Sequence, residues 1–229
     1  MNEKSWQSIW SDRVVKVGEN PSLDMLIKAD GFDQGIGDID AKAWVSICDN
    51  YANLLKLTEN MSIFEFGCGA GAFLKPFYDK YRLNVAGVDL SSSLIEIAKN
   101  VLPHGQFEVC SAQSFIPLSK FDVVAANSVI HYFQRDELSA FLQKTLTFAK
   151  QFVLISDIPN LYKMSEAEGY RKKIMQQKGI ESKYEGLSHT YYKPDELISF
   201  FKDQNWLCEV VDLGIEGSRQ SSQRFSILA

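Results

Sequence analysis

Three glycines occupy every second position in the segment FEFGCGAGAF, residues 64–73, and an acidic residue, Glu65, precedes them. A stretch without side chains lets a ligand approach the backbone closely, and free N–H groups at the start of a helix attract polar or anionic groups. Gly67, Gly69 and Ala72 also fit the dinucleotide spacing GxGxxG/A, in which the ligand is a pyrophosphate. The alternative is that the glycines only form a tight turn between a strand and a helix.

A second acidic residue, Asp89, lies at the end of the next apolar segment, 22 residues after Gly67. At the carboxyl end of a parallel strand, an acidic side chain can accept hydrogen bonds from both hydroxyls of a ribose. Asp89 could instead cap the next helix, but the serines Ser91–Ser93 already stand there. A nicotinamide enzyme would share this spacing, so Asp89 indicates a ribose-containing ligand without identifying it.

An alternation of strands and helices must position these residues. Short apolar runs predict five buried strands, at residues 61–66, 83–90, 106–110, 121–128 and 152–158. Amphipathic segments predict helices at residues 72–81, 94–102, 136–150 and 194–204. Pro76 interrupts the first of these, so that helix either kinks there or begins later than the glycines suggest. The pattern predicts an α/β fold with a mostly parallel, doubly wound sheet.

The end of the chain departs from this alternation. Residues 206–213 and 224–229 are two further strand candidates, separated only by a loop rich in glycine, serine and glutamine. Because no crossover helix fits between them, we expect them to be antiparallel neighbours. A dinucleotide-binding domain normally ends on a parallel sixth strand, so the hairpin argues against a nicotinamide enzyme.

The glycine-rich segment with Glu65 resembles the first motif of class I S-adenosylmethionine-dependent methyltransferases, and the final hairpin is similar to theirs. The resemblance covers residues 61–229 and implies a Rossmann-like, seven-stranded sheet with an antiparallel final strand. It implies S-adenosylmethionine as cofactor and S-adenosylhomocysteine as its product. Many members carry an acidic residue at the position of Gln113, which would reach the adenine. The implied cofactor-binding residues are Glu65, Phe66, Gly67, Gly69, Gly71, Asp89, Leu90, Ala112, Gln113, Asn127 and Tyr132.

Two regions outside residues 61–158 are natural covers for a substrate. The first is a predicted N-terminal helical cap, residues 1–60, in which Trp6, Trp10 and Arg13 share a helical face and residues 30–40 form a loop. The second is an insertion at about residues 159–192, which ends in the aromatic sequence SHTYYKP. Aromatic walls suit a small organic substrate, although ordinary packing is the simpler explanation for any single ring. The predicted substrate-binding residues are Trp10, Arg13, Tyr191 and Tyr192.

Two histidines are candidate catalytic bases. His131 follows the fourth predicted strand in the segment NSVIHYF, and the resemblance implies that it borders the transferable methyl group; His189 lies in the insertion. A general base accelerates transfer to a hydroxyl by about 10²–10⁴-fold, whereas a carboxylate acceptor needs no base. His131 could equally be a helix-terminal residue, and Asp157 could form a polar wall or cap a turn. The absence of an NPPY-like motif argues against the methyltransferases that act on exocyclic or amide nitrogens through that motif.

The composition limits the remaining possibilities. The chain has 229 residues, 45% of them hydrophobic, and a net charge of −5, which suit a folded protein and argue against a nucleic-acid partner. Four cysteines form no CxxC pair and have no histidine at ligand spacing, so no metal site is predicted. The basic patch at residues 171–173 is interpreted as the solvated face of a polar helix. The first ten residues contain no apolar run, so we expect no signal peptide, no membrane span and a cytoplasmic protein.

We therefore predict an S-adenosylmethionine-dependent methyltransferase that acts on a small-molecule acceptor, as a monomer or homodimer. O-methylation is favoured, in a carbohydrate or secondary-metabolite pathway. Two alternatives remain: an NAD-dependent oxidoreductase, which the glycine spacing permits, and a non-catalytic binding protein that keeps the cofactor fold.

Overall fold

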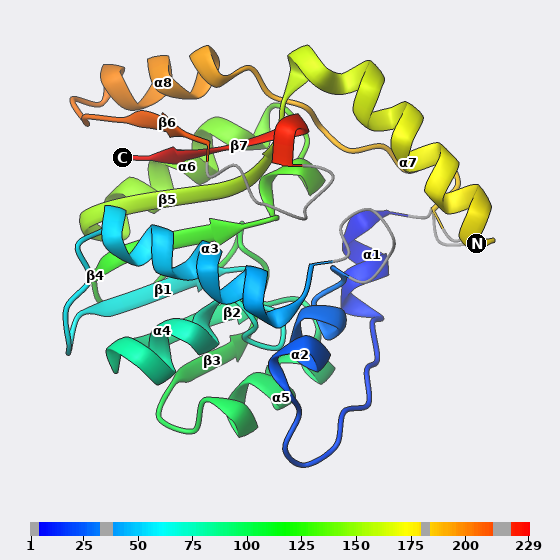
Figure 1. Ribbon diagram of the computed structural model, residues 1–229. Coiled ribbons are helices and arrows are strands. Elements are labelled where there is room, and N and C mark those ends of the chain that lie inside the picture. Colours follow the sequence, from blue (N-terminus) through cyan, green and yellow to red (C-terminus); the bar gives the residue numbers. More distant parts are fainter. Residues whose placement is uncertain (1–4, 33–38, 180–183, 213–220) are drawn as a thin grey trace.

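The computed structural model describes residues 5–32, 39–179, 184–212 and 221–229. Seven strands form one sheet in the order β3-β2-β1-β4-β5-β7-β6 (Figure 1). Strands β1 to β5 are parallel, whereas β7 pairs antiparallel with both β5 and β6. The predicted sheet with its antiparallel end is confirmed. The strands are β1 Ser62–Phe66, β2 Asn84–Asp89, β3 Gln106–Val109, β4 Phe121–Asn127, β5 Ala149–Pro159, β6 Glu209–Val211 and β7 Arg224–Leu228.

Two strands differ from the predicted ranges by more than one residue at an end. Strand β5 begins at Ala149, which pairs with Phe121 of β4, although the sequence around Lys150 is too polar to mark a strand. Strand β6 is shorter than predicted at its start, as is common for a strand at a sheet edge. Residue 213, the predicted end of that strand, lies outside the described residues.

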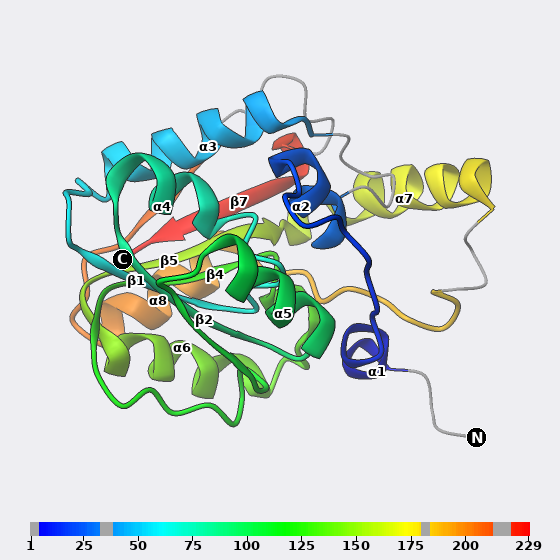
Figure 2. The ribbon, with the colours of Figure 1, turned by 90° about the horizontal axis from the view of Figure 1, so that it is seen from below.

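Helices cover both faces of the sheet, as Figures 1 and 2 show. Side chains alternate along β1, so Ile63 packs into one core and Phe64 and Phe66 into the other. The first core lies under α3 Ala41–Leu54, α4 Leu74–Tyr81 and α5 Ser92–Val101. The second lies under α6 Glu137–Phe148 and α8 Pro194–Asp203.

The starts of α4 and α5 fix the two loops that follow β1 and β2. Helix α4 begins at Leu74, later than the glycines suggest, so Pro76 falls in its first turn, where its missing N–H leaves no helical bond unmade. Helix α5 begins after Ser91, whose hydroxyl accepts a hydrogen bond from the N–H of Leu94 at 3.2 Å. Both helix starts therefore lie at the same edge of the sheet.

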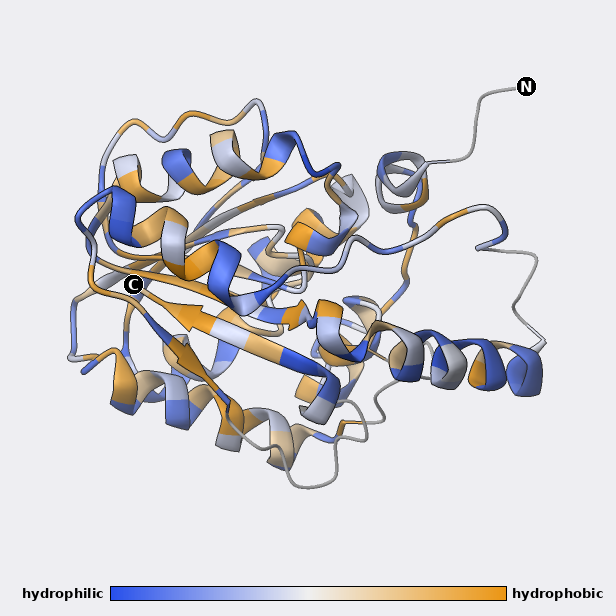
Figure 3. Ribbon diagram, turned by 90° about the horizontal axis from the view of Figure 1, so that it is seen from above, coloured by the Kyte–Doolittle hydropathy of each residue, from blue (hydrophilic) through white to orange (hydrophobic). Residues whose placement is uncertain are grey.

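Three helices lie beyond the carboxyl ends of the parallel strands: α1 Trp6–Ser11, α2 Leu23–Ala29 and α7 Met164–Lys178. Helix α7 carries mostly hydrophilic residues (Figure 3). Helix α3 belongs to the predicted N-terminal cap but packs on the same face of the sheet as α4. The boundary between a cap and a core near residue 60 therefore stays a prediction. Within the described residues, no helix combines the length and apolar character needed to cross a membrane.

Candidate functional site

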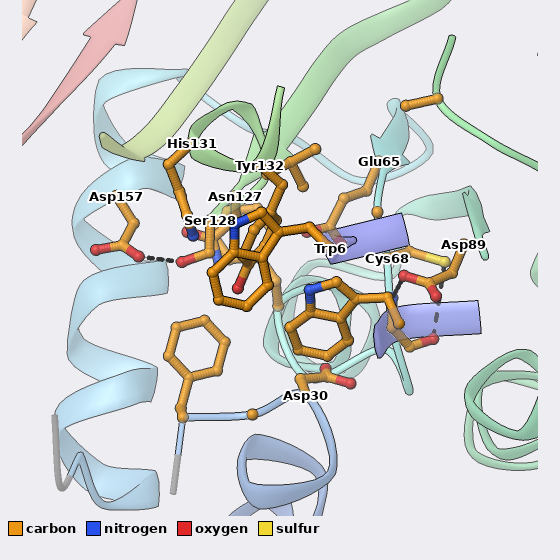
Figure 4. Close-up of a pocket in the computed structure, with 18 of the residues that line it drawn as sticks. Trp6, Asp30, Glu65, Cys68, Asp89, Asn127, Ser128, His131, Tyr132 and Asp157 are labelled. Carbon is orange, nitrogen blue, oxygen red and sulfur yellow. Dashed lines mark hydrogen bonds between the residues drawn. The ribbon is translucent and has the colours of Figure 1, made fainter. Parts of the chain in front are cut away.

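A cavity of about 330 Å³ lies at the carboxyl ends of the parallel strands (Figure 4), and residues of both α1 and α7 contribute to its lining. This is the edge where open α/β sheets bind ligands. The cavity brings together most of the predicted site residues, namely Trp10, Glu65, Gly67, Gly69, Asp89, Leu90, Ala112, Gln113, Asn127, His131, Tyr132 and His189. The predicted residues outside its lining are Arg13, Phe66, Gly71, Tyr191 and Tyr192. Residues 33–38 of the expected loop at 30–40 lie outside the described residues.

The glycine-rich loop after β1 requires its glycines for two different reasons. Gly69 has a φ of 53°, and a Cβ atom there would lie 2.2 Å from Oδ1 of Asp30. Gly71 has a φ of 88°, and its Cβ would lie 2.8 Å from a methyl group of Leu102, behind the cavity. Gly69 therefore makes room for the carboxylate of Asp30, whereas Gly71 allows close packing against α5.

Asp30 is a site residue that sequence reasoning missed. It caps the C-terminus of α2, and its carboxylate accepts the N–H groups of Ala70 at 2.5 Å and of Ala72 at 3.0 Å. Burial raises the pKa of Asp30 to about 7; the two N–H groups oppose the shift, and the charge of Asp89 adds to it. No local signal marks Asp30, because it contacts a loop about 40 residues further along the chain.

Asp89 and Glu65 add two carboxyl groups to the same end of the cavity. Asp89 accepts the N–H of Ser91 at 2.8 Å and that of Gly69 at 3.0 Å. Glu65 is 2% exposed, and its Oε2 has no hydrogen-bond partner within the described residues. Burial raises the pKa of Asp89, and burial together with the charges of Asp30 and Asp89 raises that of Glu65. A group of one buried and two half-buried carboxyls suits a ligand that carries positive charge.

The loop after β3 lies on the same side. Ala112 and Gln113 line the cavity, and Lys144 of α6 donates hydrogen bonds to both of their carbonyl groups. The side-chain amide of Gln113 is 3.5 Å from a carboxylate oxygen of Glu137. Lys144 thus fixes the loop that would face an adenine.

The ends of β4 and β5 form the opposite wall, visible on the left of Figure 4. Ser128 and Asp157 both have a φ of 58°, a conformation that non-glycine residues adopt rarely and often at functional sites. The hydroxyl of Ser128 donates a hydrogen bond to Asp157, which also forms an ion pair with Arg224 at 3.1 Å. Asn127 accepts a hydrogen bond from Ser156 at 2.8 Å. Asp157 lines the cavity, so its position supports the polar wall rather than the cap of a turn.

His131 and His189 meet at this wall, with ring centroids 4.5 Å apart. His131 lies in the 3-10 turn Ile130–Tyr132, is 3% exposed, and its Nδ1 has no hydrogen-bond partner within the described residues. Burial lowers the pKa of His131 well below its usual value, and His189, Arg224 and Arg171 lower it further. Burial also lowers the pKa of His189. Both imidazoles are therefore neutral at pH 7.

Two of the predicted substrate-binding residues, Tyr191 and Tyr192, form hydrogen bonds within the protein. Tyr192 is fully buried and donates a hydrogen bond to the carbonyl of Ile130 at 2.9 Å. Tyr191 donates to Glu168 at 2.7 Å. The segment that contains them reaches His131 directly, since the N–H of Thr190 donates to the His131 carbonyl at 2.9 Å.

Arg13 likewise acts on the protein itself. Helix α1 ends at Ser11, so Arg13 does not share a helical face with the tryptophans as expected. Its guanidinium donates to the carbonyls of Ala29 at 2.8 Å and Lys28 at 3.1 Å. These bonds hold the turn that presents Asp30 to the glycine-rich loop.

Aromatic side chains from both predicted covers close the cavity. The ring of Trp6 lies 4.9 Å from those of Tyr132 and His189 and 5.8 Å from that of Tyr184. Its indole N–H donates to the carbonyl of Ser188 at 2.8 Å. Helix α1 and the insertion therefore meet over the histidines, and Trp6, which the predicted substrate residues omitted, lies at the centre of that contact.

The comparisons with known proteins agree with this geometry. Residues 63–151 match the family model described as "Methyltransferase domain". The protein solved in complex with the Haloferax volcanii Trm112 methyltransferase activator has a TM-score of 0.66 and 12% identity, over 99% of this chain and 98% of that one. An S-adenosylmethionine-dependent methyltransferase from Clostridium acetobutylicum has a TM-score of 0.60 and 14% identity, over 83% and 92% of the two chains. Magnesium protoporphyrin IX methyltransferase from Synechocystis, with bound S-adenosylmethionine, has a TM-score of 0.57 and 15% identity, over 93% and 98%. These structures share the fold of the chain.

Proposed function

We propose that the chain is a class I S-adenosylmethionine-dependent methyltransferase that methylates a hydroxyl group of a small molecule, with His131 as the base. The match of residues 63–151 to the methyltransferase family model and the shared fold support this proposal. The cofactor is S-adenosylmethionine, which supplies an electrophilic methyl group on a positively charged sulfur. The antiparallel β7 is the feature expected to separate this family from nicotinamide enzymes, and it is present.

The residues of the cavity fit this cofactor. Its ammonium and sulfonium groups carry positive charge, and Asp30, Glu65 and Asp89 form an acidic end of the cavity. Within the described residues, Oε2 of Glu65 there has no hydrogen-bond partner. Gly67, Gly69 and Leu90 would complete the contacts to its amino-acid and ribose parts. Ala112 and Gln113 would face the adenine, and Asn127 and Tyr132 the methionine end.

The choice of a hydroxyl acceptor rests on one observation, namely that His131 has a neutral ring and an unpartnered ring nitrogen. His131 lines the cavity, its buried Nδ1 has no hydrogen-bond partner within the described residues, and its lowered pKa keeps the ring neutral. A neutral imidazole nitrogen can receive the proton that a hydroxyl loses as its oxygen takes the methyl group. The ring of His189 beside it would orient the acceptor.

The aromatic end supports a small acceptor. Trp6, Trp10, Tyr132 and His189 form walls of the kind that enclose ring-shaped or apolar molecules, with few polar groups to orient them. In this enclosed space the chain's main contribution to the rate is to hold the acceptor oxygen in line with the methyl group.

An acceptor screen tests the proposal. The formation of S-adenosylhomocysteine is measured with sugar, nucleotide, fatty and aromatic hydroxyl compounds, using the wild type, His131→Ala and the exposed-site control His104→Ala. We expect turnover with at least one acceptor, a kcat lower by about 10²–10⁴-fold in His131→Ala, and no change in His104→Ala. Turnover with no acceptor would favour the non-catalytic alternative, and an unchanged kcat in His131→Ala would contradict the assigned base.

A further inference from the structure

A buried cation lines the acceptor end of the cavity. Arg171 is only 8% exposed although α7 is a polar helix. It lies one helical turn from the buried Ala167 and from Met175, which also lines the cavity, whereas Lys172 and Lys173 are exposed. The interpretation of residues 171–173 as a solvated face is therefore correct for the lysines and wrong for Arg171.

Within the part of the chain that the structure describes, Arg171 has no close carboxylate partner to neutralise it. Its ion pair with Glu168 is long, at 4.0 Å, and the other oxygen of Glu168 accepts a hydrogen bond from Tyr191. Arg224, the second guanidinium in the lining, differs, because Asp157 lies 3.1 Å from it and also accepts its hydrogen bond through the backbone carbonyl at 2.8 Å. A buried charge without close compensation is costly. Arg171 is thus the cation in this lining that a bound anion would stabilise.

The surroundings of Arg171 indicate the shape of that anion. Its guanidinium lies 5.8 Å from the ring centre of Trp6, which packs against Tyr132 and His189. Both histidines at this end are neutral, and a further acidic residue of the lining, Asp212, is exposed. The guanidinium therefore stands at the edge of an aromatic wall, next to the proposed base.

We propose, on the basis of the proposed O-methylation, that the acceptor is a planar aromatic carboxylate. Its carboxylate binds Arg171, and its ring packs against Trp6 and Tyr132, which brings a ring hydroxyl toward His131. A planar guanidinium matches a carboxylate through two parallel hydrogen bonds. A carboxylate also balances the single charge of Arg171, whereas a phosphate monoester would bring nearly two negative charges.

The test uses ring hydroxy acids of one to three rings, each paired with its primary amide and its phosphate-ester analogue. Their affinity for the full chain saturated with S-adenosylhomocysteine is measured by calorimetry, and their methylation is measured with S-adenosylmethionine. We expect at least one acid to bind about tenfold or more tightly than its amide and its phosphate analogue. Arg171→Met should remove this preference, Arg171→Lys should keep part of it, and Lys172→Met, on the same helix, should keep all of it. Affinity for S-adenosylhomocysteine should be equal in all four proteins.

Three outcomes would overturn the proposal: amides that bind as well as their acids, phosphate analogues that bind more tightly, or an acid preference that survives in Arg171→Met. The same experiment separates this proposal from the one on which it rests. Methylation of the neutral amides alone would support O-methylation and contradict the role of Arg171. Acids that bind through Arg171 without being methylated would support the anion site and contradict O-methylation.

Discussion

The carboxylate of Asp30 accepts the backbone N–H of Ala70 at 2.5 Å, and thereby ties the end of α2 to the glycine-rich loop. A second bond, to the N–H of Ala72 at 3.0 Å, uses its other oxygen. A carboxylate that accepts hydrogen bonds from these N–H groups is favourable because the groups lie just before the start of α4. The N-terminal segment thus adds a third carboxyl group, beside Glu65 and Asp89, to the end of the cavity proposed to bind the cofactor.

Cofactor affinity should depend on pH through Asp30. Its pKa of about 7 means that the group is largely protonated at pH 6 and largely ionised at pH 8. A cationic ligand favours the ionised form, so its binding should release a proton and tighten by about tenfold as the pH rises from 6 to 8. Calorimetry with S-adenosylmethionine in buffers of different ionisation enthalpy measures both effects.

Asp30→Asn should weaken this pH dependence, and Asp203→Asn, an exposed carboxyl on α8, should leave it unchanged. An affinity that is flat from pH 6 to 8 in the wild type would show that Asp30 does not sense the cofactor's charge.

Asp89 should contribute directly to cofactor affinity. Asp89→Ala removes the acceptor for the ribose hydroxyls and also the acceptor for the N–H of Gly69, so we expect a loss of about 1.5–3 kcal/mol, or roughly ten- to a hundredfold. Asp89→Asn keeps one acceptor oxygen and should retain part of the affinity. The dissociation constant for S-adenosylhomocysteine is the readout, and an unchanged value in folded Asp89→Ala would remove this residue from the site.

A side chain at Gly69 should abolish cofactor binding. In Gly69→Val the new Cβ would collide with the carboxylate of Asp30, in a backbone conformation that valine does not tolerate. Gly18→Val is the matched control, because no atom lies within 4 Å of a Cβ at that position. Circular dichroism should show a folded sheet in both variants. Normal binding by folded Gly69→Val would place the cofactor elsewhere.

The pH dependence of turnover should report the environment of His131. A base acts in its unprotonated form, so kcat falls only as the pH drops through its pKa in the complex. Burial and the nearby Arg224 and Arg171 lower that pKa, so the acid limb should lie below about 6.5, the ordinary value for histidine. Measurements of kcat from pH 5 to 8 with a methylated acceptor test this. An acid limb at or above the ordinary value would contradict a buried, neutral base.

The sheet was predictable because most of its strands contain a short apolar run, and the final hairpin was predictable because no helix fits between residues 213 and 224. Glu65, Asp89 and Asn127 could be assigned to the site from their positions at the ends of strands alone, since the carboxyl ends of parallel strands meet at one edge of the sheet.

The covers of the cavity were less predictable, because their contacts join segments far apart in the chain. Nothing near Asp30 indicates that its carboxylate reaches the loop of β1. Similarly, the polar composition of α7 hides which residue of its basic patch faces inward, since that depends on how the helix packs. Tyr192 was predicted to contact substrate because aromatic residues often do so. Its hydroxyl donates a hydrogen bond to the carbonyl of Ile130, in the turn that contains His131.

Calorimetric titration of the full chain with S-adenosylmethionine, S-adenosylhomocysteine and NAD tests the central claim most directly, namely that the carboxyl-lined end of this one cavity holds the methyl donor. The account predicts that the first two compounds bind with one site per chain, that Gly69→Val abolishes this binding and that His131→Ala leaves it nearly intact. It also predicts no measurable binding of NAD. Binding of NAD in place of S-adenosylmethionine, or equal affinity for S-adenosylmethionine in Gly69→Val and the wild type, would contradict it.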